Sequence, residues 1–107
     1  MPPEIIKQES YVETRAGTWG FYSGKLTLTR DSISFDSPSF LFFKAKHFEI
    51  PVKNITAIEQ YLGLAGIKVT YTEENQNQTE IFAFNGKMMG NSETAASWVT
   101  AIKQLVA

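Results

Sequence analysis

The chain has 107 residues, a formal net charge of −1 and no cysteine. This length allows one domain with one core, residues 1–107. The near-neutral charge argues against a nucleic-acid partner bound through its phosphates, and the lack of cysteine excludes disulfides, thiolate catalysis and Cys-based zinc sites. Because the N-terminus has neither a basic start nor an apolar run, and no segment approaches the roughly 20 apolar residues of a membrane-spanning helix, we expect a cytoplasmic protein.

The first two thirds of the chain show strand patterns. Residues 1–8 are expected to form a short tail, and the β-prone residues 10–22 one long bent strand. Residues 24–29 and 32–36 alternate apolar and polar side chains, which is typical of strands with one buried face, and the polar turn between them predicts a hairpin. Further strands are predicted at 47–52, 54–61, 67–72 and 79–84. This makes seven strands, with a polar loop expected at 73–78.

The end of the chain has a helical period instead. Asn91 or Ser92 is a suitable N-cap, and the following residues, about 92–106, are expected to form an amphipathic helix. Its apolar side chains recur at steps of three and four residues, which predicts one buried stripe. The stripe consists of Ala95, Trp98, Val99, Ile102, Leu105 and Val106.

Three segments resemble the pleckstrin-homology (PH) superfamily. "GKLTLTRDSISF" at 24–35, followed by "FEIPVKNITAIE" at 48–59, is similar to GRAM and bacterial PH-like domains. "ETAASWVTAIKQL" at 93–105 resembles the final PH helix, which typically carries a core tryptophan, here Trp98. The resemblance implies a mainly β fold (α+β), a seven-stranded antiparallel barrel closed by one C-terminal α-helix. It also implies phosphoinositide binding through basic residues near the first two strands, where Lys25 is a candidate and Arg15 lies nearly alone.

The segment "FLFFKAKHF", residues 40–48, is the least ordinary part of the chain. One hypothesis is a contact surface for another protein or for a second copy, with Phe40, Phe42, Phe43 and His47 as interface residues. Another is a membrane-facing loop in which Lys44 and Lys46, together with Lys25, bind an anionic ligand. In the third interpretation the segment has only a structural role. Part of it then belongs to a strand whose aromatic side chains fill the barrel, and the lysines lie on the exposed face of that strand.

No arrangement of residues in the sequence indicates catalysis. A nucleophile beside a base is not apparent, and the single histidine has no second histidine or cysteine with which to bind a metal. We therefore expect no enzyme, no cofactor and no metal site. The leading hypothesis is a PH/GRAM-like binding module for protein interaction or self-association. The alternative is a peripheral domain that binds anionic phospholipid headgroups at the inner face of the membrane. A third hypothesis, a carrier for an apolar ligand, is disfavoured by the bulky core residues.

Overall fold

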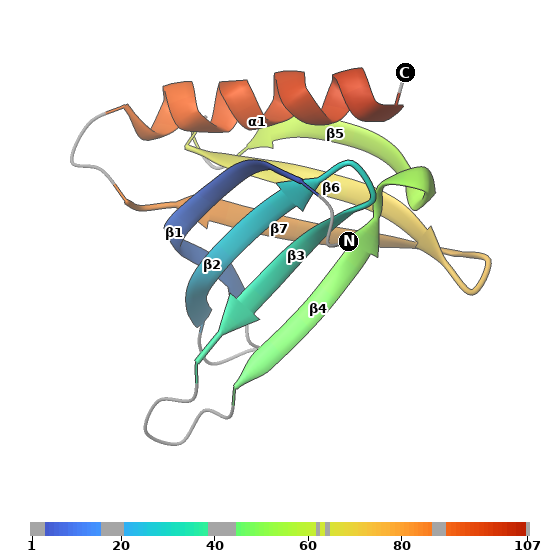
Figure 1. Ribbon diagram of the computed structural model, residues 1–107, viewed down its shortest axis with the longest axis horizontal. Helices are drawn as coiled ribbons and strands as arrows, with labels where there is room; N and C mark the ends of the chain where they lie inside the picture. Colours follow the sequence, from blue (N-terminus) through green and yellow to red (C-terminus); the bar gives the residue numbers. More distant parts are fainter. Residues whose placement is uncertain are drawn as a thin grey trace.

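A computed structural model describes residues 4–15, 21–38, 45–61, 63, 65–86 and 90–106, although within the strands the side chains of Arg15, Phe21 and Lys46 are not described. These residues form seven strands, one 3₁₀ turn and one helix (Figure 1). In chain order they are β1 (Ile5–Arg15), β2 (Phe21–Thr29), β3 (Ser32–Ser37), β4 (Lys46–Pro51), η1 (Val52–Asn54), β5 (Ile55–Tyr61), β6 (Gly66–Glu73), β7 (Gln76–Phe84) and α1 (Asn91–Val106).

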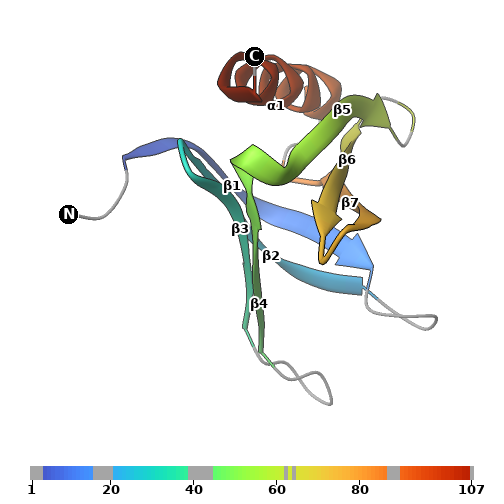
Figure 2. The same ribbon diagram turned by 90° about the vertical axis from the view of Figure 1, so that its right-hand side faces the viewer.

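The seven strands form one antiparallel sheet in the order β4-β3-β2-β1-β7-β6-β5. The predicted mainly β fold with seven antiparallel strands and one C-terminal helix is therefore confirmed. The sheet is not the closed barrel that we expected, because β4 and β5 are its two ends and do not pair with each other. It bends sharply instead, so that β1–β4 and β5–β7 face each other, with α1 lying across the end nearest β5 (Figure 2).

The inner face of the bent sheet holds the core. Alternate strand residues point inward, and the largest of these side chains, such as Phe35, Phe82 and Phe84, are at most 2% exposed. The helix adds Trp98, which is fully buried and lies 5.7 Å, ring centre to ring centre, from Phe84. The predicted core role of Trp98 and the amphipathic pattern of the helix agree with this packing, whereas Val106 at the end of the stripe is 41% exposed.

Three element boundaries differ from the sequence predictions. Strand β1 begins at Ile5, so residues 5–8 are strand and not tail. Residues 10–22 belong to two antiparallel strands and not to one bent strand, because Arg15 pairs with Phe21. The expected loop at 73–78 is a two-residue turn at Glu74 and Asn75, both with positive φ, and β6 and β7 continue up to it. A two-residue turn with positive φ at both central residues matches the twist of the paired strands. The loop was predicted too long because the polar residues on either side of this turn hide the alternation of the strands.

Strand β1 contains a β-bulge. Glu9 lies opposite Leu26 and Val12 opposite Gly24, so that two residues, Ser10 and Tyr11, oppose Lys25 alone. Tyr11 has φ 60°, a left-handed conformation that is uncommon outside glycine and that single residues in bulges adopt. Beyond the bulge β1 acquires a second neighbour, since β7 pairs with Val12, Glu13 and Thr14.

Gly24 lies where β2 and β3 approach closely. A Cβ atom at this position would lie 2.1 Å from the backbone carbonyl oxygen of Asp36, far inside van der Waals contact. Because backbone atoms cannot move aside as a flexible side chain would, only glycine fits here without a shift of β3.

We predict that Gly24→Ala destabilises the domain by about 1–3 kcal/mol, as overpacking of a tight site does. The free energy of unfolding from urea titration is the measurement. Lys25→Ala, at the exposed neighbouring position, is the control and should stay within about 0.5 kcal/mol of wild type. Equal stability of Gly24→Ala and wild type would show that β3 does not approach β2 as described.

Candidate functional site

The predicted site residues that the structure describes lie at one end of the β1–β4 half of the sheet. Lys25 on β2 is opposite Asp36 on β3, and Asp36 is opposite His47 on β4. Residues opposite each other in a sheet project to the same face, and these three are exposed, so they form one row across three strands. We call Lys25, Asp36 and His47 the outer row.

Of the other predicted site residues, the structure describes only the backbone of Lys46. Lys46 follows the outer row at the start of β4, where its backbone pairs with Ser37, but its side chain is not described. Phe40, Phe42, Phe43 and Lys44 lie outside the described residues, in the connection between β3 and β4. Whether they form an interface or a ligand site therefore stays a prediction.

His47 lies between two carboxylates. Its Nδ1 atom is 2.5 Å from Oδ1 of Asp36, and its Nε2 atom is 3.8 Å from Oε1 of Glu49. In this contact an Nδ1–H group donates to the Asp36 oxygen whenever the carboxylate is ionised, because an ionised carboxylate only accepts hydrogen bonds. More than half of each of the three side chains is exposed, so these contacts lie on the surface and not in a closed site.

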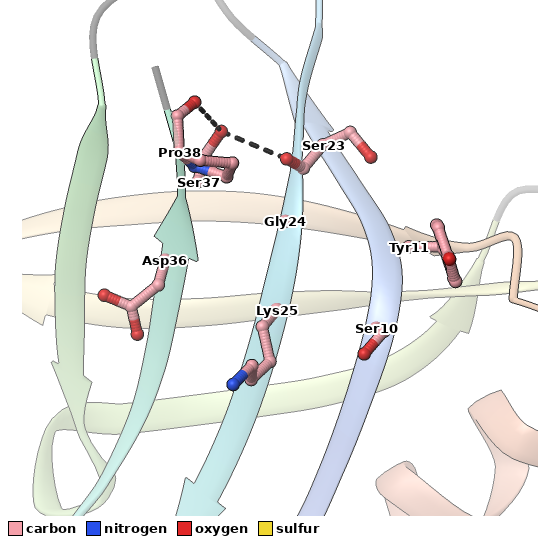
Figure 3. A pocket seen from close by; sticks show the side chains of 8 residues that line it. All are labelled: Ser10, Tyr11, Ser23, Gly24, Lys25, Asp36, Ser37 and Pro38. Carbon is pink, nitrogen blue, oxygen red and sulfur yellow. Dashed lines mark hydrogen bonds between the residues drawn. The ribbon is translucent and has the colours of Figure 1, made fainter. Parts of the chain in front are cut away.

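An open groove lies beside the outer row, with a volume of about 600 Å³ (Figure 3). Figure 3 shows Lys25 and Asp36 on neighbouring strands, with Ser10 of β1 on the other side of Lys25. Ser37 forms part of the groove, and its hydroxyl donates to the carbonyl oxygen of Ser23 at 3.1 Å, which ties β3 to β2. The groove is lined by Ser10, Tyr11, Ser23, Gly24, Lys25, Asp36, Ser37 and Pro38.

Most of the residues at this site were not predicted from the sequence, and Tyr11, Asp36 and Glu49 show why. Tyr11 is 68% exposed and lines the groove from its position in the bulge, where its φ is positive. The local sequence contains no pattern that predicts this bulge. Asp36 joins Lys25 and His47 through strand register, which needs the turn positions to be known. Glu49 could have been found, because it lies two residues after His47 and therefore on the same face of β4.

A second polar cluster lies on the inner side of the sheet. The Thr14 hydroxyl on β1 donates to a carboxylate oxygen of Glu80 on β7, and Tyr71 of β6 packs against the core. Burial raises the pKa of the Tyr71 phenol above its ordinary value of 10.0, and the carboxylates of Glu80 and Glu73 raise it further. The cluster thus stabilises the neutral phenol, since both causes act against the phenolate.

Neither a metal site nor a membrane-spanning helix is found among the described residues. Among the described residues no group of three histidine or acidic side chains is arranged to hold a metal ion. Within the same part of the chain, no helix has the length and hydrophobicity needed to cross a bilayer.

Comparison with known proteins identifies the fold. No family model matches the sequence, and no curated protein matches it. In the crystal structure of PDZ-RhoGEF DH/PH domains in complex with GTP-gamma-S-activated RhoA, the matching chain has a TM-score of 0.72 and 10% identity over 97% of this chain. The DH/PH domains of p115-RhoGEF give 0.71 and 8% over 96%. The C-terminal domain of an unknown protein from Leishmania infantum gives 0.67 and 14% over 94%, and 85% of that chain is covered.

These similarities define the class of fold. The chain has a PH-like fold, as the resemblance in its sequence implied. It spans only 29% and 30% of the two RhoGEF chains, and all three identities are 14% or lower, so the similarity concerns the fold alone. A particular closeness to GRAM domains stays a prediction.

The raised pKa of Tyr71 predicts a pH dependence of stability. The folded chain keeps the Tyr71 proton at a pH where the unfolded chain releases it, so the free energy of unfolding should fall as the pH rises above the ordinary tyrosine value of 10.0. Tyr71→Phe should make this fall shallower, measured by urea unfolding between about pH 8 and pH 11. Tyr11→Phe, at a tyrosine that is 68% exposed, controls for loss of a hydroxyl group. Equal slopes for Tyr71→Phe and wild type would contradict the prediction.

Proposed function

We propose that the chain is a non-catalytic binding module whose partner is a protein, contacted through the outer row, the groove beside it and the predicted contact segment 40–48. The mixed charge of the outer row carries this proposal. Lys25 and His47 are each directly opposite Asp36, and Glu49 adds a second carboxylate beside His47. Neighbouring charges of both signs complement a folded or extended protein surface, where both signs also occur.

An anionic headgroup requires a different arrangement. Phosphate recognition uses several cations that converge without competing carboxylates, and Asp36 lies directly between Lys25 and His47. The exposed aromatic ring of Tyr11 at the end of the groove suits a protein contact, because aromatic side chains are enriched in such interfaces. A PH-like neighbour in fold is part of a complex with activated RhoA, which is a protein partner of that chain.

Lipid binding is the second candidate function. Lys46 is next to His47 at the start of β4, and Lys44 is two positions earlier in the sequence, so the predicted set of Lys25, Lys44 and Lys46 motivates this candidate. The carrier hypothesis has no such support, since the largest inward side chains of the sheet, together with Trp98, fill the space between its two halves.

Photo-crosslinking tests the protein-binding proposal. With a photoreactive amino acid in place of His47, we expect covalent protein adducts in cells, identified by mass spectrometry. The same residue in place of Lys103, exposed on α1, is the control and should give none of these adducts. Identical adduct patterns at both positions, or none at position 47, would refute a protein contact at the outer row.

Vesicle sedimentation tests the lipid alternative. If protein is the partner, the chain stays in the supernatant with anionic vesicles at physiological salt, where weak surface attraction is screened. Asp36→Asn sharpens the test, because it frees Lys25 and His47 from their shared carboxylate neighbour. Asp31→Asn, an exposed position in the β2–β3 turn, makes the same change of charge elsewhere. Sedimentation of wild type that Asp36→Asn increases and Asp31→Asn does not would favour the lipid alternative.

A further inference from the structure

The first half of β1 has a free edge. Strand β2 pairs with β1 from Ile5 to Arg15, but β7 pairs only with Val12, Glu13 and Thr14. The last contact on the β7 side is the Asn85 N–H group, which donates to the Tyr11 carbonyl oxygen at 3.2 Å. Among the described residues, none pairs with Ile5–Ser10 on the side away from β2. Figure 2 shows this part of β1 leading away from β6 and β7.

The free edge carries exposed apolar side chains next to its charged residues Lys7 and Glu9. Ile5 is 53% exposed and Ile6 is 41% exposed, and they are two of the five large apolar side chains exposed on the described part of the chain. Natural proteins protect open edges with charges, proline or short strands, because unpaired N–H and C=O groups bind other strands. Because Ile5 and Ile6 are exposed at an unpaired edge, this edge favours a strand partner.

The helix does not close this edge. Its contacts are mainly with β5, β6, β7 and η1. Where the edge approaches the first helical turn, a cavity of about 200 Å³ separates them, lined in part by Glu9, Tyr11 and Thr94. Among the described residues, therefore, none covers the unpaired side of Ile5–Ser10.

The sequence of the edge is complementary to itself. When two copies of this edge run antiparallel with Gln8 opposite Gln8, Lys7 lies opposite Glu9 in both directions. Opposite charges that face each other across strands stabilise a sheet. Within the described residues neither Lys7 nor Glu9 forms an ion pair in the single chain, so both are available to a second copy.

We propose that the chain forms a two-fold symmetric dimer through antiparallel pairing of β1 with β1 of a second copy, in the register that sets Lys7 opposite Glu9. The pairing joins the two sheets into one across the dimer axis. Six residues a side bury less surface than a standard interface of roughly 1,600 Å², so the dimer forms in a concentration-dependent way. This inference deepens the proposed binding function by naming a second copy as one partner. The paired edge ends at Ser10, which also lines the groove, but it includes none of Lys25, Asp36 and His47, so the crosslinking result at position 47 leaves it unaffected.

Sedimentation equilibrium of the full chain tests the dimer. Wild type should rise from 12.0 kDa toward twice that mass as its concentration increases. Ile6→Lys should weaken dimerisation roughly tenfold, because it removes exposed apolar surface that the pairing would cover and puts a charge in its place. Val106→Lys is the matched control, since Val106 is apolar and 41% exposed like Ile6 but lies on α1. A constant mass of 12.0 kDa, or equal effects of the two substitutions, would overturn the proposal.

Charge exchange tests the register. Lys7→Glu and Glu9→Lys should each lower the dimer fraction, because like charges then face each other. An equimolar mixture of the two variants should dimerise again, since each carries the charges that the other lacks, and the double variant Lys7→Glu/Glu9→Lys should recover as well. Circular dichroism establishes that each variant is folded. A dimer that is indifferent to these exchanges would overturn the proposed pairing.

Discussion

The bulge at Ser10 and Tyr11 is the constraint on which both surfaces proposed for binding depend. One extra residue opposite Lys25 changes the direction of β1, so that its second half pairs with β7 and its first half does not. The groove lies at this change of direction, with both bulge residues in its wall. The free edge begins immediately before it. A continuous β1 without the bulge would present neither surface in its present form.

The chemistry of the outer row follows from strand pairing and not from any one segment. Lys25, Asp36 and His47 are far apart in the sequence and come together because three adjacent strands present them at the same level. With the carboxylates of Asp36 and Glu49 next to Lys25 and His47, the row has no large positive charge that would attract an anion over distance. Recognition at such a surface depends on matching of neighbouring groups at contact, and salt affects it less than it affects a cationic patch.

Much of the fold could be predicted from the sequence because alternation and helical periodicity are local signals. They located the hairpin around Asp31 and the helix from Asn91 with its buried Trp98. What failed depended on conformation or register: the left-handed Tyr11, the turn at Glu74, and the opening of the sheet between β4 and β5. The same limit applies to the site. Lys25 and His47 were candidates by residue type, whereas their shared neighbour Asp36 became visible only once the strands were paired.

Trp98 has a consequence for how the domain responds to force and to partners. Its indole N–H group is buried with no hydrogen-bond partner among the described residues, so the side chain is held by volume and ring contacts alone. Lifting the helix would withdraw this side chain, together with Ala95 and Ile102, from the common core of helix and strands. The core residues would then lose apolar contacts on both sides. We therefore expect release of the helix to occur together with unfolding of the sheet.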